Sequence, residues 1–164
     1  MRGRVTWLCC WLLTVAMTDG QQDLARFKAI LGDNRIRSIE ILSVSYARSP
    51  ALGIPKTRID NLADYKCKVE PTTEMLTSLV SALDTADVRD RSDPVSVYWG
   101  ARFFDESGSR IFEIYTSSGS PGMPRAAGWI GDRLMDMSPS LVRWFEKWFS
   151  PDELAAMGCT RKPD

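Results

Sequence analysis

The stretch from Val95 to Thr116 limits the possible fold more than any other part of the sequence. It reads VSVYWGARFF, then DESG, then SRIFEIYT, so two runs rich in β-branched and aromatic residues flank a short polar segment that contains glycine. This pattern predicts two antiparallel strands joined by a tight turn. We therefore expect an antiparallel sheet built around this hairpin.

The alternation of side chains sets the expected register, because a slip of one residue exchanges the two faces of a strand. A four-residue turn over Asp105 to Gly108 gives an apolar inner face, on which Val97, Trp99, Ala101 and Phe103 lie opposite Thr116, Ile114, Phe112 and Arg110. The outer face then carries Ile111 and Glu113 together with Tyr98, Arg102, Phe104 and Tyr115; the two tyrosines are opposed and Arg102 is diagonal to Glu113. A five-residue turn is the alternative, but it places Glu113 on the apolar face, which is costly without a partner.

Helical spacing of apolar residues predicts several helices. Asp23 to Leu31 reads as a short amphipathic helix that ends before Gly32, and a central helix starts at Thr72 or Thr73 and runs to about Asp84. The central helix carries one apolar stripe that needs a sheet to cover it, made of Met75, Leu76, Leu79, Val80 and Leu83. Two more helices are expected after Ser138 and Ser150, because proline follows each serine.

Shorter segments complete the expected fold. Ile36 to Tyr46, Tyr65 to Glu70 and Gly128 to Met135 are predicted strands, and Ala47 to Lys56 is a predicted loop. A single helical turn from Arg58 to Asp64 is expected, capped by Thr57 with Asp60 three residues on. The predicted fold class is α+β: an antiparallel β-sheet of about four to five strands, with helices packed mainly on one face.

The first twenty residues have the layout of a secretory signal. They read MRGRVTWLCCWLLTVAMTDG: two arginines, then an uncharged and largely apolar run from Val5 to Met17, then small and polar residues. The run is too short to cross a membrane as a helix, which needs roughly 20 residues. We expect cleavage after Gly20, one domain over residues 21–164, and a periplasmic or secreted protein; the alternative is an uncleaved membrane anchor.

Two cysteines, Cys67 and Cys159, follow the signal. In an oxidising compartment an isolated pair in a small domain most simply forms one disulfide bond. Closing so long a loop is worth about 4 to 5 kcal/mol in the chain-entropy description. The alternative is two free thiols.

Charge and composition exclude several functions. Without Arg2, Arg4 and Asp19, the 21 basic and 21 acidic residues of the chain become a net charge of about −1, so no basic excess favours nucleic acid. The chain contains no histidine, which rules out a Ser-His-Asp or Cys-His site and removes the commonest zinc ligand. The G-x-S-x-G, S-x-x-K and P-loop patterns are also missing. We expect no catalytic residue, no cofactor and no metal ion.

Paired carboxylates are the remaining catalytic alternative, because a glycosidase needs only two of them at a suitable separation. The candidates are Asp105, Glu106, Glu113, Asp132 and Asp136. Each also has a simpler interpretation, as a turn residue or as the neighbour of an arginine. The aspartates at positions 84, 87, 90 and 93 lack the glycine and distal glutamate of a calcium loop, and they read as a solvated helix exit.

The segment from Ser117 to Ala127, SSGSPGMPRAA, is longer than the two to five residues usual in a hairpin loop. Its two prolines limit the entropy lost on binding. We expect it to contact a partner through Ser118, Ser120, Met123 and Arg125. A second candidate surface is the outer face of the hairpin, where Tyr98, Arg102, Phe104 and Tyr115 suit stacking of a sugar or peptide.

These features favour a non-catalytic exported binding protein. The most useful picture is a bacterial periplasmic inhibitor or immunity protein that blocks a partner enzyme in the cell envelope. The alternatives are a small-ligand or cell-wall-binding module that uses the aromatic face, and a histidine-free hydrolase that uses two carboxylates.

Overall fold

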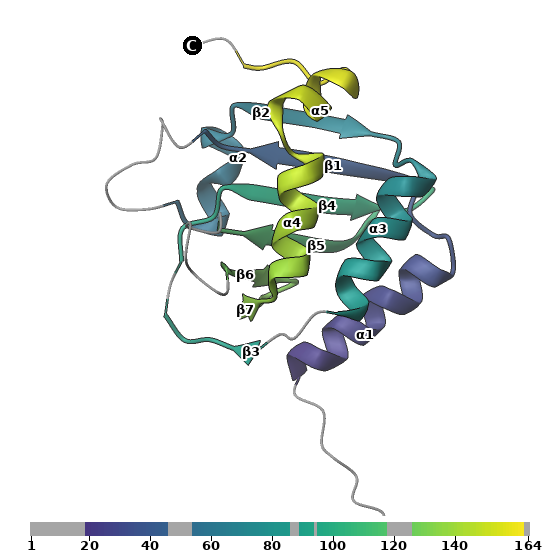
Figure 1. Ribbon diagram of the computed structural model, residues 1–164, viewed down its shortest axis with the longest axis vertical. Helices are drawn as coiled ribbons and strands as arrows, with labels where there is room; N and C mark the ends of the chain where they lie inside the picture. Colours follow the sequence, from purple (N-terminus) through teal and green to yellow (C-terminus); the bar gives the residue numbers. More distant parts are fainter. Residues whose placement is uncertain (1–18, 46–53, 86–88, 94, 118–125, 163–164) are drawn as a thin grey trace, which may run out of the picture.

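The sheet forms the middle layer of the structure, a computed structural model that describes residues 19–45, 54–85, 89–93, 95–117 and 126–162. Its seven strands are antiparallel and follow the order β2-β1-β4-β5-β6-β7-β3 (Figure 1). The strands are β1 (Ser38–Ser43), β2 (Tyr65–Val69), β3 (Arg89–Asp90), β4 (Trp99–Phe104), β5 (Arg110–Thr116), β6 (Ala126–Ile130) and β7 (Arg133–Met137). The predicted α+β class and antiparallel sheet are confirmed, with two or three strands more than expected.

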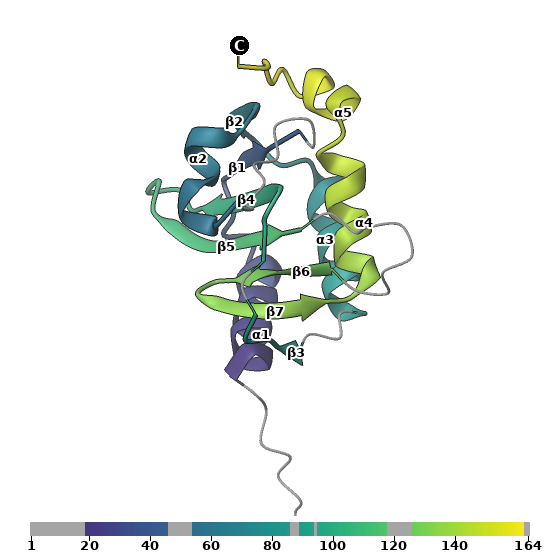
Figure 2. The same ribbon diagram turned by 90° about the vertical axis from the view of Figure 1, so that its left-hand side faces the viewer.

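Helices cover the two faces of the sheet unequally. One face packs against α1 (Asp19–Gly32), α3 (Thr73–Asp84) and α4 (Pro139–Trp148). α5 (Pro151–Ala156) follows α4 and lies beside the edge strand β2 (Figure 1). The other face carries the short elements η2 (Lys56–Arg58) and α2 (Ile59–Leu62), which lie on the opposite side of the sheet in Figure 2. Helices packed mainly on one face were predicted, and the structure agrees.

The main core lies between the sheet and the three long helices. Met75, Leu79 and Leu83 of the predicted apolar stripe are fully buried there, whereas Leu76 and Val80 are partly buried at its margin. The α3 helix begins as predicted, because the Thr72 hydroxyl accepts a hydrogen bond from the Met75 amide at 3.1 Å. Aromatic rings fill the centre, and Phe27 of α1 stacks on Phe112 at a ring-centroid distance of 3.9 Å.

A second, smaller apolar cluster lies on the opposite face, beneath α2. Its buried members are Leu42, Val44, Ile54, Ile59, Ala63, Val97 and Tyr115. The prediction that Val97 faces the main core is therefore wrong. Val97 precedes β4, and its amide donates to the Ile54 carbonyl at 2.9 Å, which draws it toward the segment that leads into α2.

The β4–β5 hairpin has the predicted faces and a different register. Ala101 pairs with Ile114 and Phe103 with Phe112, two positions from the predicted pairing, and Arg102 lies directly opposite Glu113. The turn is tighter than predicted, since the Asp105 amide donates to the Ser109 carbonyl at 3.1 Å. Phe104 pairs with Arg110 and Phe103 with Phe112, so a β-bulge leaves Ile111 of β5 without a pairing partner in β4. This extra residue returns the apolar side chains to the inner face.

The segment predicted as one strand from Gly128 to Met135 is a hairpin. β6 and β7 are joined by Gly131 and Asp132, with Ile130 paired to Arg133 and Gly131 at a φ of 57°. A Gly-Asp dipeptide between apolar runs is a hairpin signal that was present in the sequence. The predicted cap of α2 is also wrong, because Arg58 occupies its N-cap position and makes no side-chain capping bond.

The predicted disulfide is confirmed between Cys67 of β2 and Cys159, which follows α5, with the two Cα atoms 5.6 Å apart. The adjoining chain adds to this attachment. Arg161 forms an antiparallel bridge with Tyr65, and the Lys162 amide donates to the Asp64 carbonyl at 2.7 Å. The C-terminal segment is thus fixed along the edge of β2. Across the described residues, no helix has the length and apolar character needed to span a membrane.

Candidate functional site

A group of charged side chains surrounds Arg102 on the face of the sheet beneath α2. Together with Arg102 and Tyr115, these side chains are called the outer-face network. The guanidinium donates to Glu40 of β1 and to Asp60 of α2, each at 2.9 Å, and to the Tyr115 hydroxyl at 2.6 Å. Only 13% of the Arg102 side chain is exposed. The remaining members are Lys56, Lys66 and Glu113.

Lys56 holds the other end of the outer-face network. Its ammonium group pairs with Glu113, donates to the Gly131 carbonyl at 2.8 Å, and lies 3.2 Å from Asp132. It also lies over the rings of Tyr115 and Trp129, at 5.3 and 5.6 Å from their centroids. A residue predicted to end a loop therefore connects η2 to β5 and to the β6–β7 turn.

The network shifts the pKa values of several of its members. The hydrogen bond from Arg102 holds the pKa of the Asp60 carboxyl well below its usual range. Burial raises the pKa of Tyr115 to about 12, since the phenolate would lose its solvation. At neutral pH these shifts favour an ionised Asp60 and a neutral Tyr115, the forms that accept hydrogen bonds from Arg102.

The four residues of the predicted aromatic surface lie in different environments. Tyr115 is 1% exposed and Arg102 is held by Asp60 and Glu40, so neither presents an open stacking surface. Tyr98 is half-buried against the second cluster. Phe104 is half-buried at the far end of β4, with the Lys68 ammonium 4.2 Å from its centroid.

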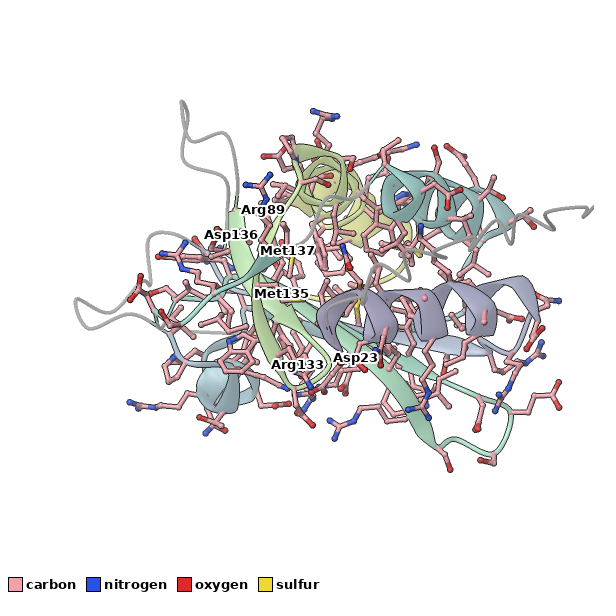
Figure 3. All side chains as sticks on the ribbon, turned by 90° about the horizontal axis from the view of Figure 1, so that it is seen from below. Asp23, Arg89, Arg133, Met135, Asp136 and Met137 are labelled. Carbon is pink, nitrogen blue, oxygen red and sulfur yellow. A yellow bond between two sulfur atoms is a disulfide. The ribbon has the colours of Figure 1, made fainter. Side chains whose placement is uncertain are left out.

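Four of the five carboxylates predicted as catalytic candidates, all except Glu106, have hydrogen-bond or ion-pair partners among the described residues. Asp136 pairs with Arg91 at 2.9 Å, and its strand position lies opposite Arg89, as Figure 3 shows from below. Asp105 accepts three hydrogen bonds from Ser107 and Ser109 within its turn. These contacts give both aspartates a structural role.

Glu113 and Asp132 are brought together by their shared partner Lys56. They line one side of an open cavity of about 580 Å³, which also contains Arg110, Arg133 and Asp23. Arg110 lies 3.0 Å from Glu113, and Arg133 lies 3.4 Å from Asp23, its neighbour in Figure 3.

The predicted contact residues Ser118, Ser120, Met123 and Arg125 lie outside the described residues, but the base of their loop is defined. The Ser117 amide donates to the Ala127 carbonyl at 2.7 Å, and the Ala127 amide donates to the Ser117 hydroxyl at 3.1 Å. Thr116 pairs with Gly128 next to this base. The loop therefore starts from two hydrogen-bonded strands at one end of the sheet.

A cavity of about 480 Å³, here called the Trp99 cavity, opens at the same end of the sheet. Tyr65, Ser43, Trp99 and Thr116 are register partners in successive strands, so the loop base lies one strand from Trp99, roughly 5 Å away. The cavity is lined by Ser43, Val44, Ser45, Asp64, Tyr65, Trp99, Glu146, Phe149, Ser150, Pro151 and Arg161. No pattern in the sequence indicated that these positions meet.

Within the described residues, no group of three or more histidine, cysteine, aspartate or glutamate side chains is arranged to hold a metal ion. Comparison with known protein families, with curated proteins and with solved structures finds no match to this chain.

Proposed function

We propose that this protein is a non-catalytic binding protein of a bacterial periplasm or of the secreted fraction, of the inhibitor or immunity type. It binds a partner enzyme in the cell envelope through the end of the sheet that carries the loop of residues 118–125. The signal-like N-terminus and the single disulfide support export, since disulfides persist in oxidising compartments.

The observation that carries this proposal is the position of the loop base beside the Trp99 cavity. Ser117 and Ala127 close the base, and Thr116 pairs with Trp99 in the adjacent strand. A partner that binds the loop is therefore expected to cover the Trp99 cavity as well. A concave pocket beside the base of a loop suits contact with a partner enzyme.

The surroundings of this surface are held rigid. The disulfide fixes the segment that carries Arg161, and the outer-face network fixes α2 on the other side of the sheet. A rigid rim lowers the conformational entropy lost when two proteins associate. The same network occupies Arg102 and covers Tyr115, which favours the loop over the aromatic face as the contact surface.

Affinity capture from a cell envelope tests the proposal. The purified protein is expected to retain an enzyme, identified by mass spectrometry, and to inhibit it in solution. A variant in which Asn-Gly replaces residues 119–125 keeps a hairpin connection between β5 and β6 and should lose both capture and inhibition. Glu106→Ala, at the opposite end of the β4–β5 hairpin, should retain both.

Three other results would contradict parts of the proposal. Unchanged capture by the shortened-loop variant, with unchanged thermal stability, would place the contact surface outside the loop. No captured enzyme from any envelope fraction would contradict the inhibitor function. Mass measurement of the exported protein should show an N-terminus at Gln21, and an intact Met1 would contradict the cleavage.

One observation favours a second candidate, the carboxylate hydrolase. Glu113 and Asp132 share Lys56 and line one cavity, as a catalytic pair would. Glu113→Gln and Asp132→Asn should each abolish turnover of cell-wall glycan if this candidate is correct. Absence of turnover by the unmodified protein would remove it.

A further inference from the structure

The Trp99 cavity combines two kinds of wall. Trp99 and Phe149 supply aromatic surface, and the Trp99 ring also stacks on Phe145 with centroids 6.4 Å apart. This packing holds the indole in one orientation at the end of β4. A fixed aromatic face is a favourable surface for a planar cation.

Carboxylates supply the polar part of the cavity. Asp64 is 1% exposed, and its side chain accepts a hydrogen bond from the Ser45 amide at 2.6 Å. Glu146 of α4 is exposed at the rim and has no ion pair among the described residues. With Arg161 as the cation in the lining, the cavity has a net negative charge.

Arg161 indicates that a guanidinium group can lie at the polar wall of the cavity. Its guanidinium lies 3.6 Å from the Asp64 carboxylate, and 54% of its side chain is exposed. The contact is longer than a hydrogen bond, and the exposed side chain has room to move. The fold therefore already places one guanidinium at the polar wall of the cavity, whose lining also includes Trp99 and Phe149.

We propose that the Trp99 cavity binds an arginine side chain of the partner protein. The apolar stem packs along Phe149, the guanidinium stacks on Trp99, and its N–H groups donate to Glu146 and to the Asp64 side of the cavity. An apolar side chain would cover Glu146 without pairing its charge, which is unfavourable. This inference rests on the proposed function for the source of the arginine, and it deepens that function by naming the chemistry of the contact.

A blocked amino acid, N-acetyl-arginine N-methylamide, is the probe, and NMR of the full purified protein is the measurement. The Trp99 indole and the Ser45 and Phe149 amide signals should shift and saturate. The citrulline derivative, similar in size but uncharged, should bind on the order of tenfold more weakly, because it lacks the charge. Equal binding of the two derivatives, or no shift at these residues, would overturn the inference.

Matched variants separate the cavity from the loop. Glu146→Gln should weaken the arginine probe severalfold, while Asp152→Asn, the same charge change on α5 outside the cavity, should leave it unchanged. Both positions are exposed, so both variants should fold normally. An unchanged affinity in Glu146→Gln would overturn the inference.

The shortened-loop variant distinguishes this inference from the proposed function. It should lose the partner enzyme and still bind the arginine probe, because the cavity lies outside the loop. Arginine-selective binding without any captured enzyme would contradict the proposed function alone. A captured enzyme whose affinity is the same for the unmodified protein and for Glu146→Gln would contradict this inference alone.

Discussion

Arg102 and Asp60 form a two-point ion pair that joins β4 to α2. Nη1 and Nη2 of Arg102 each donate to one carboxylate oxygen of Asp60, and Nη1 also reaches Glu40 of β1. This bidentate geometry is the strongest form of a charge-assisted hydrogen bond. It is the main polar attachment of α2 to the sheet.

Asp60→Asn should destabilise the fold by about 2 kcal/mol, because it leaves a mostly buried guanidinium with a weaker acceptor. Urea denaturation would measure the change. Lys66→Gln is the matched control, since Lys66 also contacts Asp60 at 2.7 Å but is 47% exposed. Its cost should stay below about 1 kcal/mol. Equal effects of the two variants would contradict the role of Arg102.

The same contact predicts a response to acid. Because the folded pKa of Asp60 is lowered by Arg102, the contribution is present above the unfolded pKa of about 4 and is lost as the pH falls toward the folded value. The difference in unfolding free energy between the unmodified protein and Asp60→Asn should therefore shrink below about pH 4. A difference that stayed constant down to acid unfolding would contradict this origin.

Sequence patterns predicted most helices and strands, because interactions between residues close in sequence determine where these elements form. The Thr72 cap and the apolar spacing of α3 act within one helix, and Cys67 and Cys159, the two cysteines that follow residue 20, allow one pairing. The faces of β4 and β5 followed from alternation. The register did not, because the tighter turn and the bulge in β5 together shift the pairing by two positions, which keeps the faces and cannot be detected from alternation.

The outer-face network and the Trp99 cavity were predicted only in part, because their contacts join segments that are far apart in the sequence. Asp60 has the spacing of a capping residue, and only the packing of α2 against β4 makes it a partner of Arg102. Lys56 carried no signal, since its partners Glu113 and Asp132 are far away in sequence. The Trp99 cavity joins segments from β1 to the C-terminus, which no single-sequence pattern relates.

Tyr115 predicts a loss of stability in alkali. Burial raises its folded pKa to about 12, against about 10 in an unfolded chain, so the neutral phenol stabilises the fold below pH 10. This contribution should be lost as the pH rises from about 10 to about 12. Tyr115→Phe removes the titration and should be less sensitive over this range when unfolding is followed by urea. The same alkaline dependence in both proteins would assign it to another group.

Removal of the disulfide should cost more than any single hydrogen bond. Cys67 and Cys159 are 92 positions apart, which corresponds to about 4 to 5 kcal/mol of loop entropy. The double variant Cys67→Ser, Cys159→Ser should lose about this amount in a urea titration, and reduction of the unmodified protein should give a similar loss. A cost below about 1 kcal/mol would show that the Arg161 and Lys162 backbone contacts hold the C-terminal segment without the bond.

Gly128 is required by the close approach of β5 and β6 at the base of the loop. A Cβ atom at this position would overlap the Tyr115 carbonyl and lie 2.8 Å from the Thr116 Cα, both of which are backbone atoms that cannot turn aside. Gly128→Ala should therefore destabilise the fold by about 3 kcal/mol. Gly32→Ala is the control, since Gly32 ends α1 with no atom within 4 Å of the added methyl group. Its effect should lie within about 1 kcal/mol and favour the helix.

Because Gly128 pairs with Thr116 beside the loop base, Gly128→Ala should also weaken capture of the partner at temperatures where the variant remains folded. Unchanged stability in Gly128→Ala would show that β6 can move away from β5, and the loop base would then not be the fixed platform that the proposed contact requires.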